Sequence, residues 1–262
     1  MSIYKINKPA ALLIDLDGVL RIGNKPAEGL QEFFGYLSVS GRPSCIISNS
    51  TLSSSGDVIR FFKDQGINCP IPVLTTVNAA LSFIQDRYER VAVYCSENVK
   101  ILFNRYLDYE NPQAVIIGDM GKSWNFEILN DIFKKVYYGA ELVAMQKNRF
   151  WKTPEEDLLI DAGAIVSAVE YAAGKSSILV GKPSPVYFYS ALKLLGYNEG
   201  ASFIMLGDDI ETDIGGANDL NGVTILIYTG KTKYPLNNNI KIKPHYEARN
   251  LFQVISLLKD LD

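Results

Sequence analysis

The sequence predicts an α/β protein: a doubly wound, Rossmann-like parallel sheet that is interrupted by an inserted α/β domain. Three observations support this prediction. Short apolar runs alternate with segments of helical periodicity along the whole chain, as they do in parallel α/β proteins. The runs are apolar at consecutive positions, which is typical of strands covered on both faces. Several of them end in polar residues, and open α/β sheets bind ligands at the carboxyl ends of their strands.

The first part of the chain alternates strand and helix patterns. We expect, in order, a strand that starts at Ala10 and runs into Asp15 and Asp17, a polar turn region at 21–29, a helix at 30–40, a strand at 44–48 and a helix from about 54 to 65. Gly41 ends the first helix. The pattern Ser54-x-x-Asp57 is a capping box that begins the second helix, which Gly66 ends.

The middle of the chain has strands and helices of its own. We expect, in order, a helix at 79–88, a strand at 91–94, a helix, a strand at 114–117, a helix at about 126–136, a strand at 141–145, an aromatic and charged loop, and a helix at 164–173. Phe126 and Leu129 have the spacing of core residues on one helix. A segment with this many elements is a domain and not a loop.

The first pattern then resumes. We expect a strand at 177–180, a helix that begins at Ser184-Pro185 and ends at Gly196, a strand at 203–206, a helix at about 214–220, a strand at 223–227 and a helix at about 251–261. Because these strands are of the same buried kind as the first ones, we predict that they complete one sheet. The predicted domains are a core of residues 1–77 and 177–262 and an inserted cap of residues 78–176.

Composition excludes several classes of protein. The chain has 262 residues, 47% of them hydrophobic, and a net charge of −3, so it lacks the basic excess of a nucleic-acid or membrane-surface protein. No run reaches membrane-spanning length. The three cysteines, Cys45, Cys69 and Cys95, have no C-x-x-C spacing and indicate reduced thiols in a cytoplasmic protein. The single histidine, His245, is expected in a surface loop.

Acidic residues follow two of the predicted strands. Asp15 and Asp17 stand two residues apart, so both would point to one side if the strand continued to Asp17. Asp208 and Asp209 follow a later strand, with Asp213 close behind. Two carboxylates about 4 Å apart repel by roughly 4 kcal/mol at an effective dielectric constant near 20, so the group requires a cation. Oxygen ligands without histidine or cysteine favour Mg²⁺.

Two further strand ends supply groups that bind phosphate. The Ser48 hydroxyl and the amides of the residues that follow it, Asn49 and Ser50, can donate hydrogen bonds to phosphate oxygens. Lys182 offers an ammonium that suits a phosphoryl oxygen and an attacking carboxylate. A carboxylate can attack phosphorus and form an aspartyl phosphate, which water then hydrolyses.

In this order, the motifs D-L-D-G-V-L, I-S-N-S, V-G-K-P and G-D-D-x-x-x-D resemble the four motifs of the haloacid dehalogenase superfamily of phosphohydrolases. The contexts K-P-S-P and T-D-I-G-G-A are similar to those of its type IIA branch, which is named NagD-like. Residues 148–183 look most like the phospholysine, phosphohistidine and inorganic pyrophosphate phosphatases of that branch.

The resemblance implies a role for each matching residue. It makes Asp15 the nucleophile and Asp17 the general acid and then base, with Ser48 and Lys182 on the phosphoryl group. It makes Mg²⁺ the cofactor, held by Asp15, Asp208 and the backbone carbonyl of Asp17. The remaining expected roles are phosphate or substrate binding by Gly18, Asn49, Ser50 and Lys182, and orientation of metal-bound water by Asp209 and Asp213. The presence of Asp17 argues for phosphoryl transfer over dehalogenation.

The resemblance also implies a cap between the second and third motifs, a small phosphorylated metabolite as substrate, no nucleic-acid or membrane partner, and a homodimer. Two departures lie where relatives select substrates: Ala144-Met145-Gln146-Lys147 after the last cap strand, and Arg21 where many relatives have tryptophan. Candidate substrate contacts in the cap are Asp119, Lys147, Arg149, Phe150 and Trp151, each of which also fits a packing or surface role. The alternatives are a catalytically idle phospho-ligand-binding module and a phosphomutase. The sequence leaves the natural substrate open.

Overall fold

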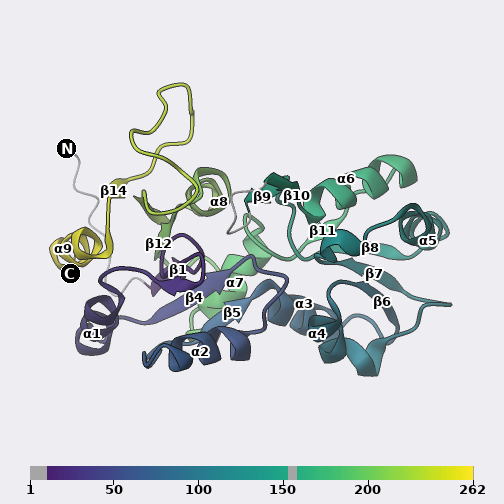
Figure 1. Ribbon diagram of the computed structural model, residues 1–262, viewed down its shortest axis with the longest axis horizontal. Coiled ribbons are helices and arrows are strands. Elements are labelled where there is room, and N and C mark those ends of the chain that lie inside the picture. Colours follow the sequence, from purple (N-terminus) through teal and green to yellow (C-terminus); the bar gives the residue numbers. More distant parts are fainter. Residues whose placement is uncertain (1–10, 153–157, 262) are drawn as a thin grey trace. The chain divides into compact units, whose positions relative to one another are not determined.

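The computed structural model describes residues 11–152 and 158–261, which form two compact units (Figure 1). The first unit comprises the described residues up to Ser48, then Asp57–Leu74 and the chain from Lys182 onward. The second comprises Asn49–Gly56 and the described part of Thr75–Gly181. This division differs from the predicted domain limits at residues 49–56, 75–77 and 177–181. Ala10, where the first strand was predicted to begin, lies outside the described residues.

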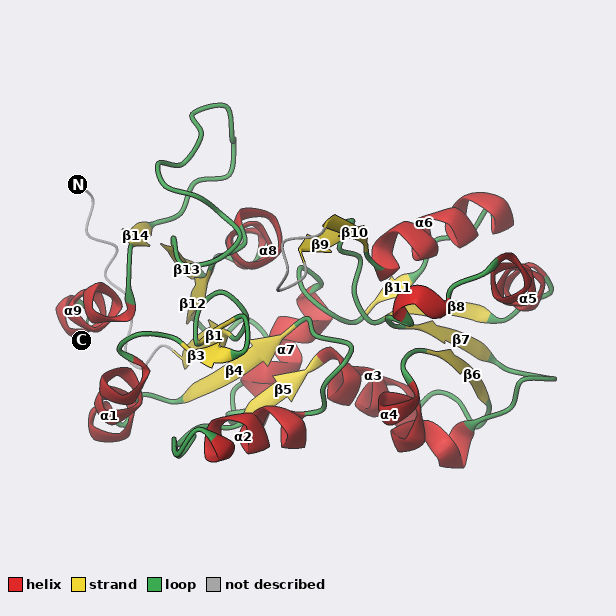
Figure 2. Cartoon of the chain, in the orientation of Figure 1, coloured by secondary structure: helices red, strands yellow, loops and turns green. Residues whose placement is uncertain are grey.

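A six-stranded sheet forms the centre of the first unit, in the order β14-β13-β12-β1-β4-β5 (Figure 2). Its strands are β1 (Ala11–Asp15), β4 (Ser44–Ser48), β5 (Val73–Thr75), β12 (Phe203–Gly207), β13 (Val223–Ile227) and β14 (Tyr246–Ala248). β1 pairs in parallel with β12 on one side and β4 on the other, so strands from both ends of the chain lie side by side. In this register Asp15 lies beside Ile47, one residue before Ser48.

Helices cover both faces of this sheet. The helices of this unit are α1 (Leu30–Ser40), α2 (Ser55–Asp64), α7 (Pro185–Leu194), α8 (Gly216–Asp219) and α9 (Leu251–Asp260). Side chains of α1, α2 and α9 share one buried cluster with Ile14 of β1 and Leu206 of β12. Because side chains alternate along a strand, the neighbouring residues of β1 and β12 point to the opposite face of the sheet. There the ring of Phe188 on α7 packs 5.8 Å from that of Phe203. The sheet is therefore doubly wound, and the predicted fold class is confirmed.

The second unit is built on a parallel four-stranded sheet, β11-β8-β7-β6. Its strands are β6 (Val91–Tyr94), β7 (Ala114–Ile117), β8 (Glu141–Ala144) and β11 (Ile178–Leu179), and its helices are α3 (Thr76–Gln85), α4 (Glu97–Lys100), α5 (Phe126–Tyr137) and α6 (Ala162–Ala173), with 3-10 turns at Ile101–Tyr106 and Gly121–Ser123. One buried cluster joins α3 and α4 to the sheet, and a second joins α5 and α6.

The strand predicted at 177–180 was assigned to the wrong sheet. The observed strand, β11, pairs with β8 in the second unit and not with the strands of the first. A two-residue strand carries too little pattern to reveal which sheet it joins. Lys182 therefore follows a strand of the second unit's sheet in the sequence, and the first unit resumes only after Gly181.

Several short elements were not predicted. These are the hairpin β2 (Arg21–Ile22) with β3 (Lys25–Pro26), the strands β5 and β14, and the antiparallel pair β9 (Phe150–Lys152) and β10 (Leu158–Ile160) in the predicted loop. The prediction that Phe126 is a core residue is wrong, because its side chain is 72% exposed. In α5 the buried positions are Ile132 and Val136, and Phe126, at the first turn, does not share their face of the helix.

Candidate active site

A buried ammonium connects two motifs at the carboxyl edge of the six-stranded sheet. Lys182 Nζ lies 2.5 Å from Asp15 Oδ1 and 2.7 Å from Asp213 Oδ1. All three side chains are buried. Asp15 is the last residue of β1, and Asp213 lies in the π-helix Ile210–Gly215 that follows β12. The predicted meeting of Asp15 and Lys182 is thus observed, and Asp213 joins them.

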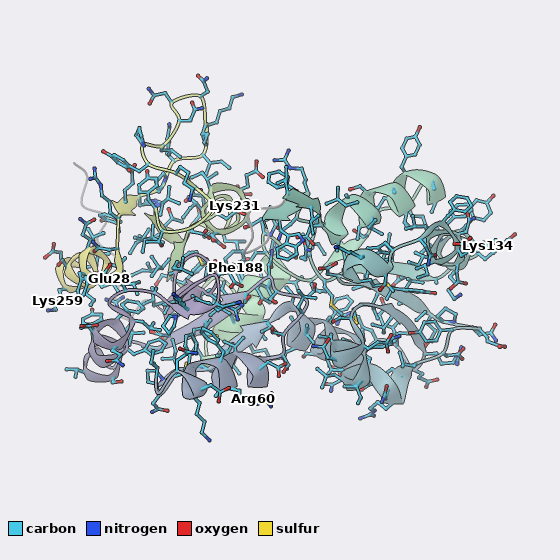
Figure 3. The ribbon with its side chains drawn as sticks, viewed as in Figure 1. Glu28, Arg60, Lys134, Phe188, Lys231 and Lys259 are labelled. Atoms are coloured by element: carbon cyan, nitrogen blue, oxygen red, sulfur yellow. The ribbon has the colours of Figure 1, made fainter. Side chains whose placement is uncertain are left out.

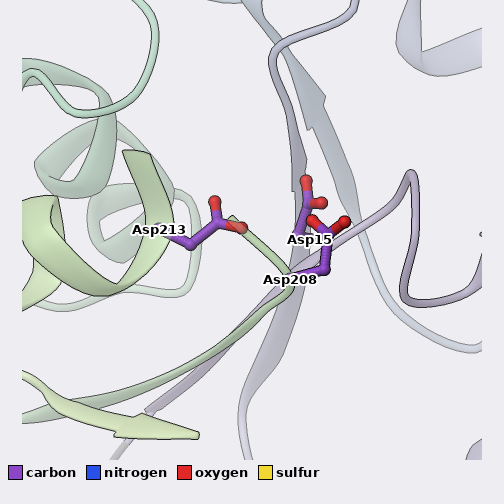
Figure 4. A group of neighbouring side chains, drawn as sticks. All are labelled: Asp15, Asp208 and Asp213. Atoms are coloured by element: carbon purple, nitrogen blue, oxygen red, sulfur yellow. The ribbon is translucent and has the colours of Figure 1, made fainter. Parts of the chain in front are cut away.

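Three carboxylates converge at this point (Figure 4). Asp15, Asp208 and Asp213 each offer an oxygen, and these oxygens lie within 4.8 Å of one another. Asp208 directly follows β12, so it stands beside Asp15 because β1 and β12 are neighbours. Asp213 points toward the other two from its helix. Gly207 makes this approach possible, since a Cβ at that position would lie 2.3 Å from Asp213 Oδ2.

The electrostatics of the cluster call for a cation. Burial, with a smaller contribution from the Asp213 carboxylate, raises the pKa of Asp208 to about 7. Burial also raises the pKa of Asp15 and of Asp213, against the opposing effect of Lys182. Burial alone would lower the pKa of Lys182, but Asp15 and Asp213 together hold it above its ordinary value. With three carboxylates against one ammonium, a hard divalent cation fits these oxygen donors.

Two glycines and a loop fix the position of Asp208. A Cβ on Gly18 would lie 2.1 Å from Asp208 Oδ2, and one on Gly230 would lie 1.9 Å from it. Gly18 also has a φ of +86°, so its position requires glycine twice over. The backbone N–H of Lys231 donates to Asp208 Oδ2 at 2.5 Å. The hydroxyl of Thr229, the residue before Gly230, donates to the carbonyl of Gly18, so this hydrogen bond holds the two glycines near each other.

Asp209 caps the helix that carries Asp213. Its Oδ1 accepts hydrogen bonds from the N–H groups of Glu211 and Thr212, at 2.9 and 3.3 Å. Its Oδ2 lies 2.5 Å from Lys231 Nζ, whose side chain is labelled in Figure 3. Although burial raises the pKa of Asp209, Lys231 and these hydrogen bonds hold it below the ordinary value. Asp209 therefore acts on the position of Asp213, and its own charge is already balanced.

Asp17 lies outside the buried group of carboxylates that contains Asp15. Strand β1 ends at Asp15, and the chain turns at Leu16, whose carbonyl accepts from the N–H groups of Leu20 and Arg21. The strand therefore does not continue to Asp17, which was the condition for a common direction of the two side chains. Asp17 Oδ1 instead lies 2.8 Å from the Arg21 guanidinium, and the Asp17 side chain is 52% exposed. The Arg21 guanidinium also lies 5.2 Å from the centre of the Phe61 ring.

Ser48 ends β4 next to the acidic cluster. Its side chain is 1% exposed, and its backbone N–H donates to the hydroxyl of Tyr187 at 3.1 Å. Asn49 and Ser50, which were expected to bind phosphate with Ser48, belong to the second unit. Within that unit the Ser50 carbonyl accepts from the Thr76 hydroxyl at 2.8 Å.

The candidate substrate contacts in the second unit have partners of their own. Lys147 Nζ lies 2.7 Å from Glu170 Oε2. Asp119 is buried and accepts from the N–H of Gly121 at 2.7 Å. Phe150 and Trp151 lie in β9, where Phe150 is 43% exposed. Arg149 precedes that strand.

Sequence reasoning missed two residues of this edge. Lys231 follows β13 with no motif around it, and only its contacts with Asp208 and Asp209 reveal its place. Tyr187 lies inside α7 and its spacing is that of a core residue, so no pattern distinguishes its hydroxyl. His245 is exposed as expected, with its Nδ1 at 3.2 Å from the N–H of Thr224.

Fold and site together define a class of protein: a doubly wound α/β protein with a buried acidic cluster and a lysine at the carboxyl edge of its sheet. Two family models match the chain. One, described as haloacid dehalogenase-like hydrolase, matches residues 12–106, and one described as HAD-hydrolase-like matches residues 179–254. Human haloacid dehalogenase-like hydrolase domain-containing protein 2 is 31% identical over 235 residues, which are 89% of each chain. The chain belongs to the haloacid dehalogenase-like hydrolase family, as its motifs predicted.

Other similar proteins carry names of phosphatases. Human phospholysine phosphohistidine inorganic pyrophosphate phosphatase is 28% identical over 94% of this chain and 93% of its own. The crystal structure of a 4-nitrophenylphosphatase from Thermotoga maritima aligns with a TM-score of 0.85 at 24% identity, over 96% and 97% of the two chains. NagD from Escherichia coli K-12 aligns with a TM-score of 0.81 at 22% identity, over 92% and 96%. These alignments show the same fold.

One further solved structure was obtained with a metal. It is the glycerol phosphate phosphatase Rv1692 from Mycobacterium tuberculosis, in complex with magnesium, which aligns with a TM-score of 0.76 at 22% identity over 93% of this chain and 75% of its own. Among the residues that the structure describes, no helix is both long and apolar enough to span a membrane.

Proposed function

We propose that this protein is a Mg²⁺-dependent phosphatase that hydrolyses small phosphorylated compounds through an aspartyl phosphate. The single observation that carries the proposal is the convergence of Asp15, Asp208 and Asp213 on one point, with the Lys182 ammonium on Asp15. Oxygen donors of this kind suit Mg²⁺, and a carboxylate held beside an ammonium suits attack on phosphorus.

In this mechanism Asp15 is the nucleophile. Lys182 holds Asp15 Oδ1, so we assign the attack to Oδ2, which forms a bond to phosphorus as the bond to the leaving oxygen breaks. Asp15 must be ionised to attack, while burial and the neighbouring carboxylates raise its pKa. Asp15 and Asp208, with the carbonyl of Asp17, would hold Mg²⁺, which supplies the positive charge that keeps Asp15 ionised and balances the phosphoryl oxygens.

We assign the proton transfers to Asp17. It would give its proton to the leaving oxygen in the first step, then accept a proton from the water that attacks the phosphorus of the aspartyl phosphate, releasing phosphate and free Asp15. This role requires the carboxyl group to leave the Arg21 guanidinium. The Asp17–Arg21 ion pair is partly exposed, and such pairs contribute only about 0–1 kcal/mol, so the cost of this rotation is small.

We propose that Lys182, Ser48 and the amides near Gly18 bind the phosphoryl oxygens. Lys182 supplies the charge, and Ser48, at the end of β4, supplies a hydroxyl next to the strand of Asp15. Asn49 and Ser50 are proposed as additional phosphate ligands on the strength of their position directly after Ser48. Asp209 and Asp213 are proposed to orient bound water, and Asp213 is also placed to act as a direct ligand.

The substrate class follows from the names of relatives. A protein named for phospholysine, phosphohistidine and inorganic pyrophosphate and one named for 4-nitrophenyl phosphate are both similar to this chain, so we propose phosphoamidates, pyrophosphate and small phosphate monoesters as substrates. A homodimer, and a cytoplasmic location in keeping with the unpaired cysteines, remain predictions.

Hydrolysis of p-nitrophenyl phosphate tests the proposal. The wild-type protein should release phosphate with Mg²⁺ and stop when EDTA is added, and Asp15→Asn should abolish turnover. Glu97→Gln, an exposed acid of the second unit, serves as the matched control and should leave turnover unchanged. Turnover by Asp15→Asn would overturn the mechanism. Binding of phosphate without hydrolysis of any ester would instead indicate an idle binding module, and transfer to a second substrate position without free phosphate would indicate a phosphomutase.

A further inference from the structure

We propose that Tyr187 is a positioning residue that sets the place of Ser48 at the phosphate-binding edge, an inference that rests on the proposed function. Tyr187 lies on α7 and is completely buried in the first unit. Its hydroxyl is directed at two neighbouring strands, β4 and β5.

The Tyr187 hydroxyl takes the place of one backbone hydrogen bond between β4 and β5. The N–H of Ile46 on β4 donates to the carbonyl of Pro72, just before β5, at 2.9 Å. In a regular parallel ladder the next rung would join the N–H of Ser48 to the carbonyl of Leu74, two residues further along each strand. Here the Ser48 N–H donates to Tyr187 Oη at 3.1 Å, and Tyr187 Oη lies 2.7 Å from the Leu74 carbonyl oxygen.

The same hydroxyl has a second acceptor within reach. Tyr187 Oη also lies 2.7 Å from the carbonyl oxygen of Ser48. A phenol carries one proton, which it donates to the carbonyl of either Ser48 or Leu74, while its lone pair accepts the Ser48 N–H. Burial raises the pKa of Tyr187, so the hydroxyl stays protonated. One buried side chain therefore accepts the Ser48 N–H and offers its single proton to the carbonyl of Ser48 or of Leu74.

Ser48 and Leu74 have a further property in common. Each is the last residue of the first unit before the chain passes into the second, at Asn49 and at Thr75. Tyr187 therefore contacts the two points at which the chain leaves the first unit. A side chain locked by packing and hydrogen bonds is the kind of support that keeps a binding group within a fraction of an ångström of its working place.

Loss of the hydroxyl has two possible structural results. In Tyr187→Phe, either β4 and β5 close so that Ser48 bonds directly to Leu74, or the buried N–H and carbonyl groups remain without a partner. In the first case Ser48 is displaced, and in the second its backbone loses the side chain that holds it. The contacts of Lys182 with Asp15 and Asp213, and of the Lys231 N–H with Asp208, do not include Tyr187, so we expect them to be kept in both cases.

The test compares Tyr187→Phe with a matched control, Tyr109→Phe. Tyr109 lies in the second unit and donates to the carbonyl of Val93 at 2.7 Å, so the control also removes one tyrosine-to-backbone hydrogen bond. The dissociation constants of Mg²⁺ alone, and of inorganic phosphate in saturating Mg²⁺, are measured by calorimetry on the full chain. The kcat and KM for p-nitrophenyl phosphate are measured alongside, and the Tm records any general loss of stability.

We expect Tyr187→Phe to weaken phosphate binding about tenfold and to lower kcat/KM by a similar factor, with the Mg²⁺ constant within about twofold of wild type. Tyr109→Phe should change neither constant, although both variants lower the Tm. An unchanged phosphate constant in Tyr187→Phe overturns the inference, as does a parallel weakening of Mg²⁺ and phosphate, which indicates general collapse of the site. Failure of the proposed function is a distinct result, because the wild-type protein would then hydrolyse no phosphate ester. If the wild-type protein also bound no phosphate, both the proposed function and the inference on Tyr187 would be overturned.

Discussion

Lys182 Nζ lies 2.5 Å from Asp15 Oδ1, and both side chains are almost completely removed from solvent. The two residues are 167 positions apart in the sequence. Their contact joins the end of β1 to Lys182, the residue at which the final segment of the first unit begins. With Asp213 on its other side, Lys182 balances part of a buried negative charge, and it does so before any ligand binds.

Lys182→Met should therefore destabilise the protein. Removing one partner of a buried ion pair leaves an uncompensated charge and costs about 3–5 kcal/mol. Unfolding in urea, followed by circular dichroism, measures this loss. A second change, Asp213→Asn, removes one of the two carboxylates that Lys182 contacts and should restore part of the stability. A loss below about 1 kcal/mol, or a double variant less stable than Lys182→Met, would contradict this account.

Gly18→Ala should damage the cation site. The new Cβ would lie 2.1 Å from Asp208 Oδ2, so the carboxylate must move away from Asp15. Gly23→Ala is the matched control, because Gly23 also has a positive φ, +58°, but has nothing within 4 Å of its Cβ position. Both changes cost roughly 1–2 kcal/mol of backbone strain. Only Gly18→Ala should weaken Mg²⁺ binding, by about tenfold or more in calorimetry. Equal Mg²⁺ constants in the two variants would refute the constraint.

The fold was largely predictable because long buried strands carry a strong pattern. Strands such as β1 and β4 and helices such as α1, which ends at Gly41, were found within a residue or two. Elements of two or three residues escaped, because a period cannot be established over so short a run. The sheet to which β11 belongs depends on pairing with β8, a tertiary contact that leaves no mark on residues 177–180.

The candidate site was predictable where strand ends meet and not where the chain bends. Asp15 and Asp208 come together because β1 and β12 are neighbours in a parallel sheet, a consequence of the predicted fold. The direction of Asp17 depends on the turn at Leu16, which local sequence did not reveal. Asp213 enters the cluster through a π-helix, Ile210–Gly215, whereas the sequence predicts a helix that begins only at about residue 214.

Mg²⁺ should stabilise the wild-type protein against heat. The three clustered carboxylates repel one another, and a bound cation removes that repulsion. At a concentration about 100 times the dissociation constant, a ligand adds about 2.7 kcal/mol, which raises the Tm by roughly 5–10 °C in a chain of this size. Differential scanning calorimetry with Mg²⁺ and with EDTA measures the difference.

Two variants sharpen this metal test. Asp208→Asn should lose most of the shift and, in EDTA, should melt above the wild type, because one of the three repelling charges is gone. Asp17→Asn should keep the shift, since the Asp17 side chain is 52% exposed and paired with Arg21. An equal Mg²⁺ shift in wild type and Asp208→Asn would show that the cation binds elsewhere.

The Glu170 carboxylate should make the stability of the second unit depend on pH. Although burial raises its pKa, the Lys147 ammonium at 2.7 Å and the N–H and hydroxyl of Ser177 lower it below the ordinary value. A lowered pKa in the folded state contributes stability above the unfolded value of 4.5 and loses it as the pH falls below that. Glu170→Gln should therefore destabilise the unit by about 1 kcal/mol at pH 7, a value reduced by the partial exposure of Lys147, and by progressively less between pH 4.5 and 3. Lys147→Met should show the same trend in calorimetric melts. A destabilisation that stays constant from pH 7 to pH 3 would mean that lost packing, and not the ion pair, is responsible.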